Sequence, residues 1–164
     1  MWPCGAGPGR GGTLHRMNIP FLDNWRKRAA PRLGAPPGQR GGDGAWGEGV
    51  AQLLSECELL RSRALAAGVV LGDTAHSLEA LDQLLPRWRD DPEELAGLGT
   101  DAGLYLGTVL VRTVPGARWA PGARGGPVVV LAPGRRLDVL AAGREWAEAG
   151  APGLSQVYAA SARL

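Results

Sequence analysis

The most reactive side chains in this sequence are two cysteines and two histidines. Cys57 and His76 could form the nucleophile and base of a Cys–His enzyme. However, Cys57 falls on the apolar side of a predicted helix, where a thiol is usually buried and unreactive. His76 stands at a predicted helix start, where we expect it to face solvent. With Cys4 and His15, these residues are scattered rather than clustered at chelating spacings, so the sequence predicts no catalytic residue, metal or cofactor.

Carboxylates offer a second kind of chemistry, because acids occur in close pairs and Asp138 stands among apolar residues of a predicted strand. Paired acids act in acid–base catalysis only where burial separates their pKa values, and helix surfaces explain these pairs better. For Asp138 two interpretations remain. A structural ion pair with Arg112 or Arg118 is favoured, and the alternative is a ligand pocket lined by Tyr105, Arg112 and Asp138. The pairs are Glu56 and Glu58, Asp90 and Asp91, and Glu93 and Glu94.

Two glycine-rich patterns suggest nucleotide or nucleic-acid binding but lack the necessary context. Gly7–Gly12 matches G-x-G-x-x-G, yet that motif requires a preceding strand and a following helix, and here it lies in a tail rich in Gly and Pro. Arg-Gly-Gly triplets begin at Arg10, Arg40 and Arg124, but they are scattered rather than dense and interleaved with aromatics. We therefore expect no specific nucleic-acid partner.

A better binding candidate is a short basic and apolar segment that begins at Met17. Its apolar side and basic end suit an anionic membrane surface or an acidic groove of a partner, although docking on the protein's own body or simple solvation explains it equally well. Large aromatic side chains are also enriched at interaction sites. The candidate binding residues are Phe21, Leu22, Trp25, Arg26, Lys27, Arg28, Trp88 and Trp119.

Charge divides the chain near residue 44. Residues 1–44 carry seven basic and two acidic side chains, whereas residues 45–164 carry eleven and fourteen. The first part is rich in Gly and Pro, so we expect a disordered basic tail and linker, followed by one α+β domain over residues 45–164. Both Met1 and Met17 are open as the native start. The run after Met17 resembles a true start and favours it, in which case residues 1–16 are not native.

Two cysteines do not make a disulfide framework, and the first sixteen residues contain no apolar secretory core. The longest apolar run, Ala64–Leu71, is far short of the roughly 20 residues that span a bilayer. We therefore expect a cytoplasmic protein without a transmembrane segment.

Hydrophobic spacing predicts several helices before a small sheet. One helix covers Trp46–Ala67, and a second covers Leu78–Leu85. A third begins with the capping sequence Asp91–Glu94, breaks around Gly97–Gly99 and resumes as far as Thr113. Three short antiparallel strands and two further helices follow. The strands are Ala117–Pro121, Pro127–Ala132 and Leu137–Val139, and the helices are Leu140–Ala149 and Leu154–Ala162.

Five stretches resemble a family of small actinobacterial proteins known only as a domain of unknown function. The resemblance covers about residues 17–158 and implies no catalytic or ligand residues for this chain. The stretches are Phe21–Arg28, 53–61, Ser77–Asp82, Asp101–Gly107 and Leu154–Tyr158.

The sequence favours a non-enzymatic module that binds another protein. One alternative is a small-molecule binder or small enzyme with a pocket between the sheet and the third helix. Another is weak membrane or nucleic-acid attachment through Phe21–Arg28.

Overall fold

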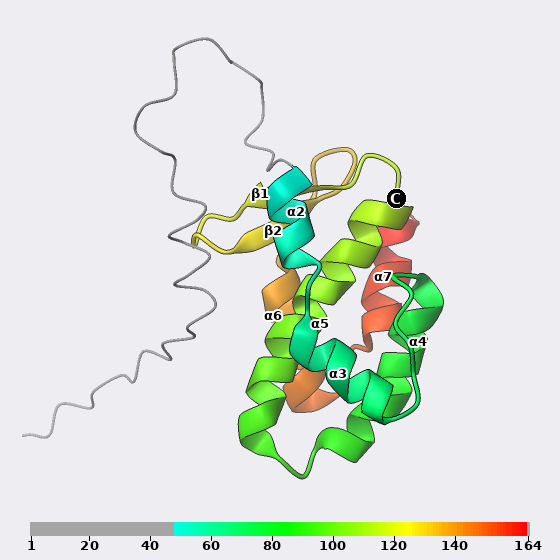
Figure 1. Ribbon diagram of the computed structural model, residues 1–164. Coiled ribbons are helices and arrows are strands. Elements are labelled where there is room, and N and C mark those ends of the chain that lie inside the picture. The colour runs from blue at the N-terminus through cyan, green and yellow to red at the C-terminus, as the bar shows by residue number, and fades with distance from the viewer. Residues whose placement is uncertain (1–47, 164) are drawn as a thin grey trace, which may run out of the picture. The chain divides into compact units, whose positions relative to one another are not determined.

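The computed structural model describes residues 48–163, and the labels of Figure 1 begin at α2. All described residues belong to one compact unit. The predicted tail and the candidate residues between Phe21 and Arg28 lie outside the described residues. The predicted domain boundary near Ala45 therefore stays a prediction.

The single helix predicted for Trp46–Ala67 is wrong, because the structure has two helices there. They are α2 (Glu48–Leu54) and α3 (Glu58–Ala66). Between them Cys57 adopts a left-handed backbone with φ 41°, and the hydroxyl of Ser55 donates to the carbonyl of Gln52 at 2.7 Å. Serine side chains that bond to nearby backbone in this way compete with helical hydrogen bonds, so the chain turns at this point.

The second helix, α4 (Ala75–Leu84), begins earlier than the predicted Leu78. Thr74 is its N-cap, and the hydroxyl of Thr74 accepts from the backbone N–H of Ser77 at 3.4 Å. Pro86 was expected to end the helical segment at Leu85, but the chain continues as a 3₁₀ turn, η1 (Leu85–Trp88). Proline is tolerated in a first helical turn because the N–H that it lacks has no partner there.

Helix α5 (Pro92–Thr113) is the longest element and runs without a break. Asp91 caps it as predicted, accepting from the N–H of Glu94 at 3.1 Å. The predicted interruption at Gly97–Gly99 is wrong. Gly99 and Gly103 instead allow close contact with α6 (Val139–Ala149), since a Cβ at Gly103 would overlap the carbonyl oxygen of Val139. These glycines serve packing between helices rather than chain reversal.

The three predicted strands form one antiparallel sheet in the order β1-β2-β3. Trp119 lies opposite Val129, which lies opposite Leu137. The third strand is shifted toward the N-terminus by comparison with the prediction, because Asp138 begins α6 instead of extending the strand. The strands are β1 (Arg118–Pro121), β2 (Pro127–Val130) and β3 (Arg136–Leu137).

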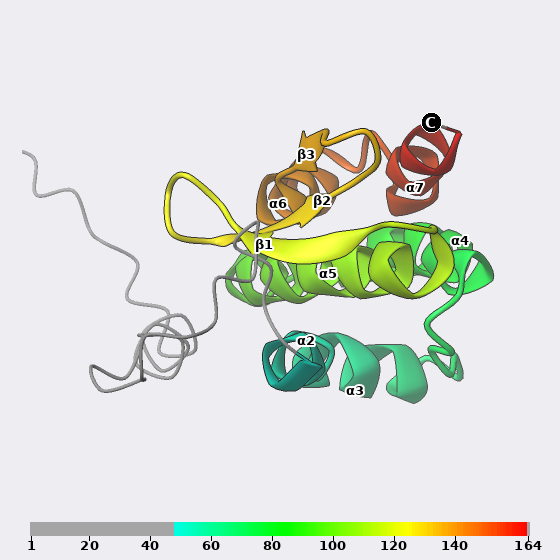
Figure 2. The ribbon, with the colours of Figure 1, turned by 90° about the horizontal axis from the view of Figure 1, so that it is seen from above.

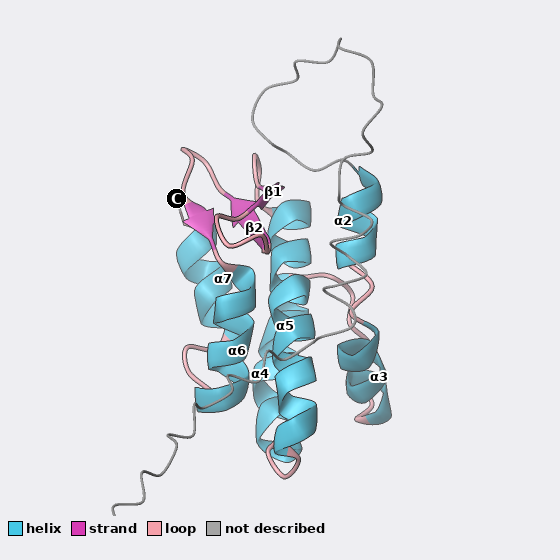
Figure 3. Ribbon diagram, turned by 90° about the vertical axis from the view of Figure 1, so that its left-hand side faces the viewer, coloured by secondary structure: helices cyan, strands magenta, loops and turns pink. Residues whose placement is uncertain are grey.

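Helix α5 forms the centre of the described unit (Figures 2 and 3). Helices α2 and α3 lie on one side of it, and α6 and α7 (Leu154–Ala162) lie on the other. The sheet lies at the end of the unit where α5 finishes (Figure 1). Core residues such as Tyr105, Val109 and Trp146 are at most 1% exposed. The predicted α+β class is confirmed, and no helix within residues 48–163 is long and apolar enough to cross a membrane.

Candidate functional site

Asp138, the acid singled out by the sequence, does not lie on a strand. It is exposed and serves as the N-cap of α6, where Oδ1 accepts from the N–H of Ala141 at 2.9 Å. A carboxylate at this position satisfies an otherwise unpaired helix N–H group and interacts favourably with the positive end of the helix. The role shown for Asp138 is therefore helix capping.

Tyr105 and Arg112 meet at a different acid, Asp73. The Tyr105 hydroxyl accepts from the N–H of Asp73 at 2.9 Å. Arg112 Nη1 lies 2.6 Å from Asp73 Oδ2, and Arg61 Nη2 lies 2.7 Å from Asp73 Oδ1. Burial raises the pKa of Tyr105. Sequence reasoning thus found two members of this cluster and missed the shared carboxylate, which stands in a loop without any motif.

The two candidate tryptophans differ in exposure. Trp119 is only 3% exposed, and its indole ring packs against Gly107 of α5, where a Cβ would overlap it. Its ring belongs to the core and exposes only an edge, so a binding role for Trp119 stays a prediction. Trp88 is half-buried in η1.

Neither the cysteine nor the histidine of the described residues lies in a reactive setting. Burial raises the pKa of the Cys57 thiol, and the carboxylate of Asp101 acts in the same direction. The side chain of His76 is 89% exposed, and its Nδ1 lies 3.3 Å from Glu79 Oε2. Within residues 48–163 no group of three or more His, Cys, Asp or Glu side chains could hold a metal ion.

Asp82 is the centre of a polar cluster that the sequence did not reveal. Its Oδ1 accepts from Trp146 Nε1 at 2.8 Å and from the N–H of Leu154 at 2.7 Å. Its Oδ2 accepts from the N–H and the hydroxyl of Ser155, at 3.1 and 2.6 Å. One carboxylate of α4 therefore connects α6 to the N-terminus of α7. All four donors come from the chain itself, so this cluster is structural.

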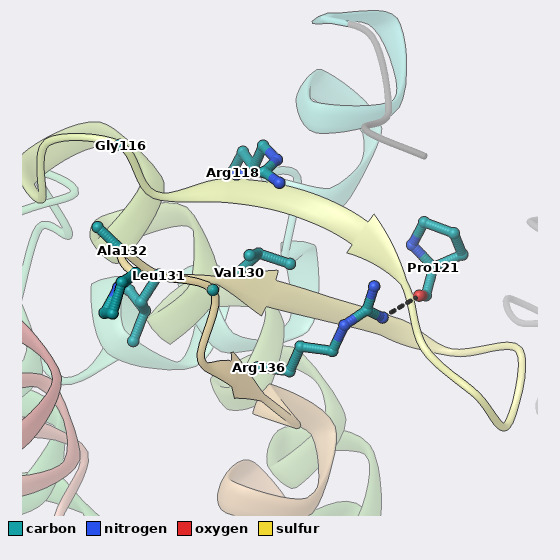
Figure 4. A pocket seen from close by; sticks show the side chains of 9 residues that line it. Gly116, Arg118, Pro121, Val130, Leu131, Ala132 and Arg136 are labelled. Atoms are coloured by element: carbon teal, nitrogen blue, oxygen red, sulfur yellow. Dashed lines mark hydrogen bonds between the residues drawn. The ribbon is translucent and has the colours of Figure 1, made fainter. Parts of the chain in front are cut away.

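The best candidate for binding is an open cavity of about 810 Å³ at the sheet (Figure 4). Arg118 of β1 and Arg136 of β3 supply its charged side chains, and none of the nine residues that line it is acidic. Val130 and Leu131 lie beneath the cavity and are only 4% and 1% exposed, and the turn at 132–134 forms part of the wall. Such a surface offers positive charge with little apolar contact area.

Strand register explains why the two arginines share this surface. Arg118 is paired with Val130, and Val130 is paired with Arg136, so the three side chains form a row on one face of the sheet. The Cα atoms of the two arginines are two strand spacings apart, roughly 10 Å. Residues next to them in sequence point to the opposite face, where Trp119 packs on α5. The arginine row therefore lies on the face away from α5.

Arg136 is held in place by the sheet itself. Its Nη1 donates to the carbonyl oxygen of Pro121 at 3.1 Å (Figure 4). The side chain must cross β2 to reach β1, because β2 is the middle strand. Arginine has five N–H donors, so this single hydrogen bond orients the guanidinium and leaves donors for a ligand.

Charge is distributed unevenly over the described residues. Residues 112–137 contain five arginines and no acidic residue, whereas the rest of the described chain carries six basic and fourteen acidic residues. Arg112 is paired with Asp73, and Asp138 follows just after this segment. Even so, the sheet end is the basic part of a unit that is otherwise acidic. Anionic partners are therefore attracted to this end.

The fold and this surface define a small helical α+β protein with a basic face on its sheet. The chain belongs to the family of unknown function DUF6278, whose model matches residues 17–164. The predicted resemblance to a domain of unknown function is thus confirmed, while an actinobacterial origin stays a prediction. No curated protein and no solved structure matches the chain.

Proposed function

We propose that this protein is a non-enzymatic interaction module that binds an acidic segment of another protein at the sheet. The observation that carries the proposal is the cavity of about 810 Å³ with Arg118 and Arg136 at its walls and no carboxylate among the described residues that line it. Arginine is suited to such contacts, because its planar guanidinium binds carboxylates in a bidentate manner and is weakly hydrated.

An acidic protein segment fits this surface better than a nucleic acid does. Proteins that hold single-stranded nucleic acid combine basic grooves with aromatic platforms for the bases, and none of the described residues that line this cavity is aromatic. The acidic excess of the remaining described residues would repel an extended phosphate backbone. A short acidic peptide contacts only the basic end and avoids that repulsion.

The test compares two charge-reversal variants of the full chain as baits in native lysate. The first carries Arg118→Glu and Arg136→Glu. The second carries Arg87→Glu and Arg144→Glu, two exposed arginines outside the basic segment, and it has the same net charge as the first. Bound proteins are quantified by mass spectrometry after nuclease treatment, and each candidate partner is then purified and titrated directly.

We expect a partner that is bound by the wild type and by the second variant but at least tenfold more weakly by the first. Its binding should also weaken as salt is raised, because exposed charges are screened. A partner retained equally by both variants would place binding elsewhere. Binding that disappears with nuclease treatment would favour a nucleic-acid contact and overturn the proposal.

The alternative of a small-molecule binder is favoured by a second cavity, which lies between α2, α5 and β1. This is part of the region where the sequence analysis expected a pocket, between the third helix and the sheet. Arg112 lines it, whereas Tyr105 and Asp138 do not. Attachment through the residues between Phe21 and Arg28 stays a prediction.

A further inference from the structure

A groove of about 620 Å³ lies between α2, α5 and β1, separate from the arginine row of the sheet. Ala51, Val111 and Trp119 give it apolar walls, and among the described residues that line it only Arg112 is charged. Pockets for small molecules commonly measure roughly 300–1,000 Å³ and combine apolar walls with a few oriented polar groups. The groove meets this description.

Arg112 retains positive charge despite its ion pair with Asp73. The guanidinium groups of Arg61 and Arg112 share this one carboxylate, at 2.7 and 2.6 Å, so the three side chains together carry net +1. The side chain of Arg112 is 53% exposed, whereas that of Asp73 is 13% exposed. The unbalanced charge is therefore available to a ligand on the Arg112 side.

The same cluster also orients Arg112. Asp73 is fixed by Arg61 and by the hydrogen bond from its backbone N–H to the hydroxyl of Tyr105. Arg61 is fixed in turn by hydrogen bonds to the carbonyl oxygens of Ser55 and Leu71, at 3.1 and 3.2 Å. A guanidinium oriented before binding loses less conformational entropy when a ligand arrives.

The hydroxyl groups in the groove are acceptors rather than free donors. Ser55 donates to the carbonyl oxygen of Gln52 at 2.7 Å, and Thr108 donates to that of Leu104 at 2.9 Å. Each hydroxyl proton is therefore already used, and charged donation to a ligand comes from Arg112. This arrangement favours an anionic group near Arg112 and an apolar body along Ala51, Val111 and the edge of Trp119.

We propose that the groove between α2, α5 and β1 binds a small organic carboxylate with an apolar body, held by Arg112. This site goes beyond the proposed interaction module and does not depend on it. The carboxylate pairs with the donors of Arg112 that Asp73 leaves unused. The apolar body displaces water from the walls.

The test titrates the full chain with 1-naphthoate and, as a neutral control of the same shape, with 1-naphthamide. Binding is measured by calorimetry and located by ¹H–¹⁵N chemical-shift mapping. We expect 1-naphthoate to saturate the protein with at least tenfold higher affinity than the amide, and the shifts to cluster on α2, the C-terminal half of α5 and β1.

Two variants and two controls make this test specific. Arg112→Gln should reduce 1-naphthoate affinity at least tenfold, and Ala51→Leu, which fills the groove from a helical position, should abolish binding of both compounds. Arg87→Gln should bind as the wild type does. The Arg118→Glu/Arg136→Glu variant should also retain 1-naphthoate, which separates this site from the sheet surface.

Equal affinity for the acid and the amide would overturn the proposal, as would unchanged binding by Arg112→Gln. Chemical shifts that move elsewhere, or binding that survives Ala51→Leu, would also overturn it. Circular dichroism of each variant verifies that loss of binding does not reflect loss of folding.

Discussion

Two polar clusters of this protein differ in whether hydrogen bonds within the protein already satisfy their polar groups. This difference distinguishes a structural cluster from a candidate binding site. At Asp82 both carboxylate oxygens accept two hydrogen bonds each, all from α6 or α7. At the sheet, Arg136 donates one hydrogen bond within the protein, to the carbonyl oxygen of Pro121, and lines an open cavity. The first cluster is completed by the fold itself, whereas the second has donors that an external anion can use.

The contrast also explains why the two clusters should respond differently to substitution. Removing an acceptor from a satisfied, part-buried network leaves its donors without partners. The free energy lost is then larger than the net stabilisation that the hydrogen bonds contributed, because the unpaired donors stay shielded from water. Removing an exposed donor leaves its former partner in contact with water. We therefore expect stability effects at Asp82 and binding effects at the sheet.

The largest expected effect is that of Asp82→Ala. The substitution leaves Trp146 Nε1 and the N–H groups of Leu154 and Ser155 without their acceptor, and should lower the free energy of unfolding by about 3–5 kcal/mol. Urea denaturation measures this change. Asp90→Ala, an exposed acid, is the matched control and should change stability by less than about 0.5 kcal/mol. A loss below about 1 kcal/mol at Asp82 would contradict the structural role.

The next effect concerns the contact that holds β1 against α5. Gly107→Ala places a methyl group where it would overlap the indole ring of Trp119. Overpacking of this kind should lower the free energy of unfolding by about 1–3 kcal/mol. Thermal and urea unfolding report the change, and Trp119→Phe in the same chain should recover part of it. Gly97→Ala is the control, because its methyl group meets only the flexible end of Leu59. Equal effects at both glycines would argue against this contact.

Asp101 should give a smaller effect with a distinctive pH dependence. It lies on α5 and accepts from the N–H of Leu60 at 3.1 Å, so it caps α3 in place of Cys57. Asp101→Ala should therefore cost about 1–2 kcal/mol, and Asp101→Asn, which retains an acceptor, should cost much less.

The pH dependence follows from burial, which raises the pKa of Asp101 although the N–H of Leu60 opposes the change. A carboxyl with a raised pKa in the folded state contributes stability that is present below its unfolded pKa of about 3.9. This contribution is lost as pH rises through the folded value. The stability of the wild type relative to Asp101→Asn should therefore fall between about pH 3.9 and neutral pH. Urea denaturation across this range tests the sign, and a rise would contradict it.

The smallest expected stability effect is that of Arg136→Gln. Its hydrogen bond to Pro121 is exposed, so the free energy of unfolding should change by less than about 0.5 kcal/mol. Affinity for an acidic partner at the sheet should still fall severalfold, because one charged donor is lost. Calorimetry with the purified partner measures affinity, and urea denaturation measures stability. A large stability loss without a binding loss would make Arg136 a structural residue like Asp82.

Local signals account for the parts of the fold that were predicted correctly. The cap at Asp91 lies within three residues of the N–H group that it accepts from, and the hairpin turn is marked by the glycines at its ends. Because these interactions lie within a few residues, the sequence alone revealed the start of α5, the three strands and the α+β class.

The sequence predictions were wrong where a residue type fits two different structural roles. Glycines at 97–99 resemble a helix break, but packing of α6 against Gly99 and Gly103 compensates for their low helix propensity. An apolar pattern continued through Ser55–Cys57, although the chain turns there. Asp138 stood between apolar residues as in a strand, yet it caps α6.

The sequence by itself determined the cap of α5 at Asp91, the three strands and the run of arginines between residues 112 and 137. Only the tertiary structure decided which acids serve the fold: Asp73 pairs with an arginine 39 residues away, Asp101 caps a helix 41 residues away, and Asp82 bonds to Ser155, 73 residues away. It also decided that Arg118 and Arg136 share one face, because pairing through β2 aligns them with Val130. Hydrogen bonds and charges act over a few ångströms in space, and such distances between remote residues are set only when the chain has folded.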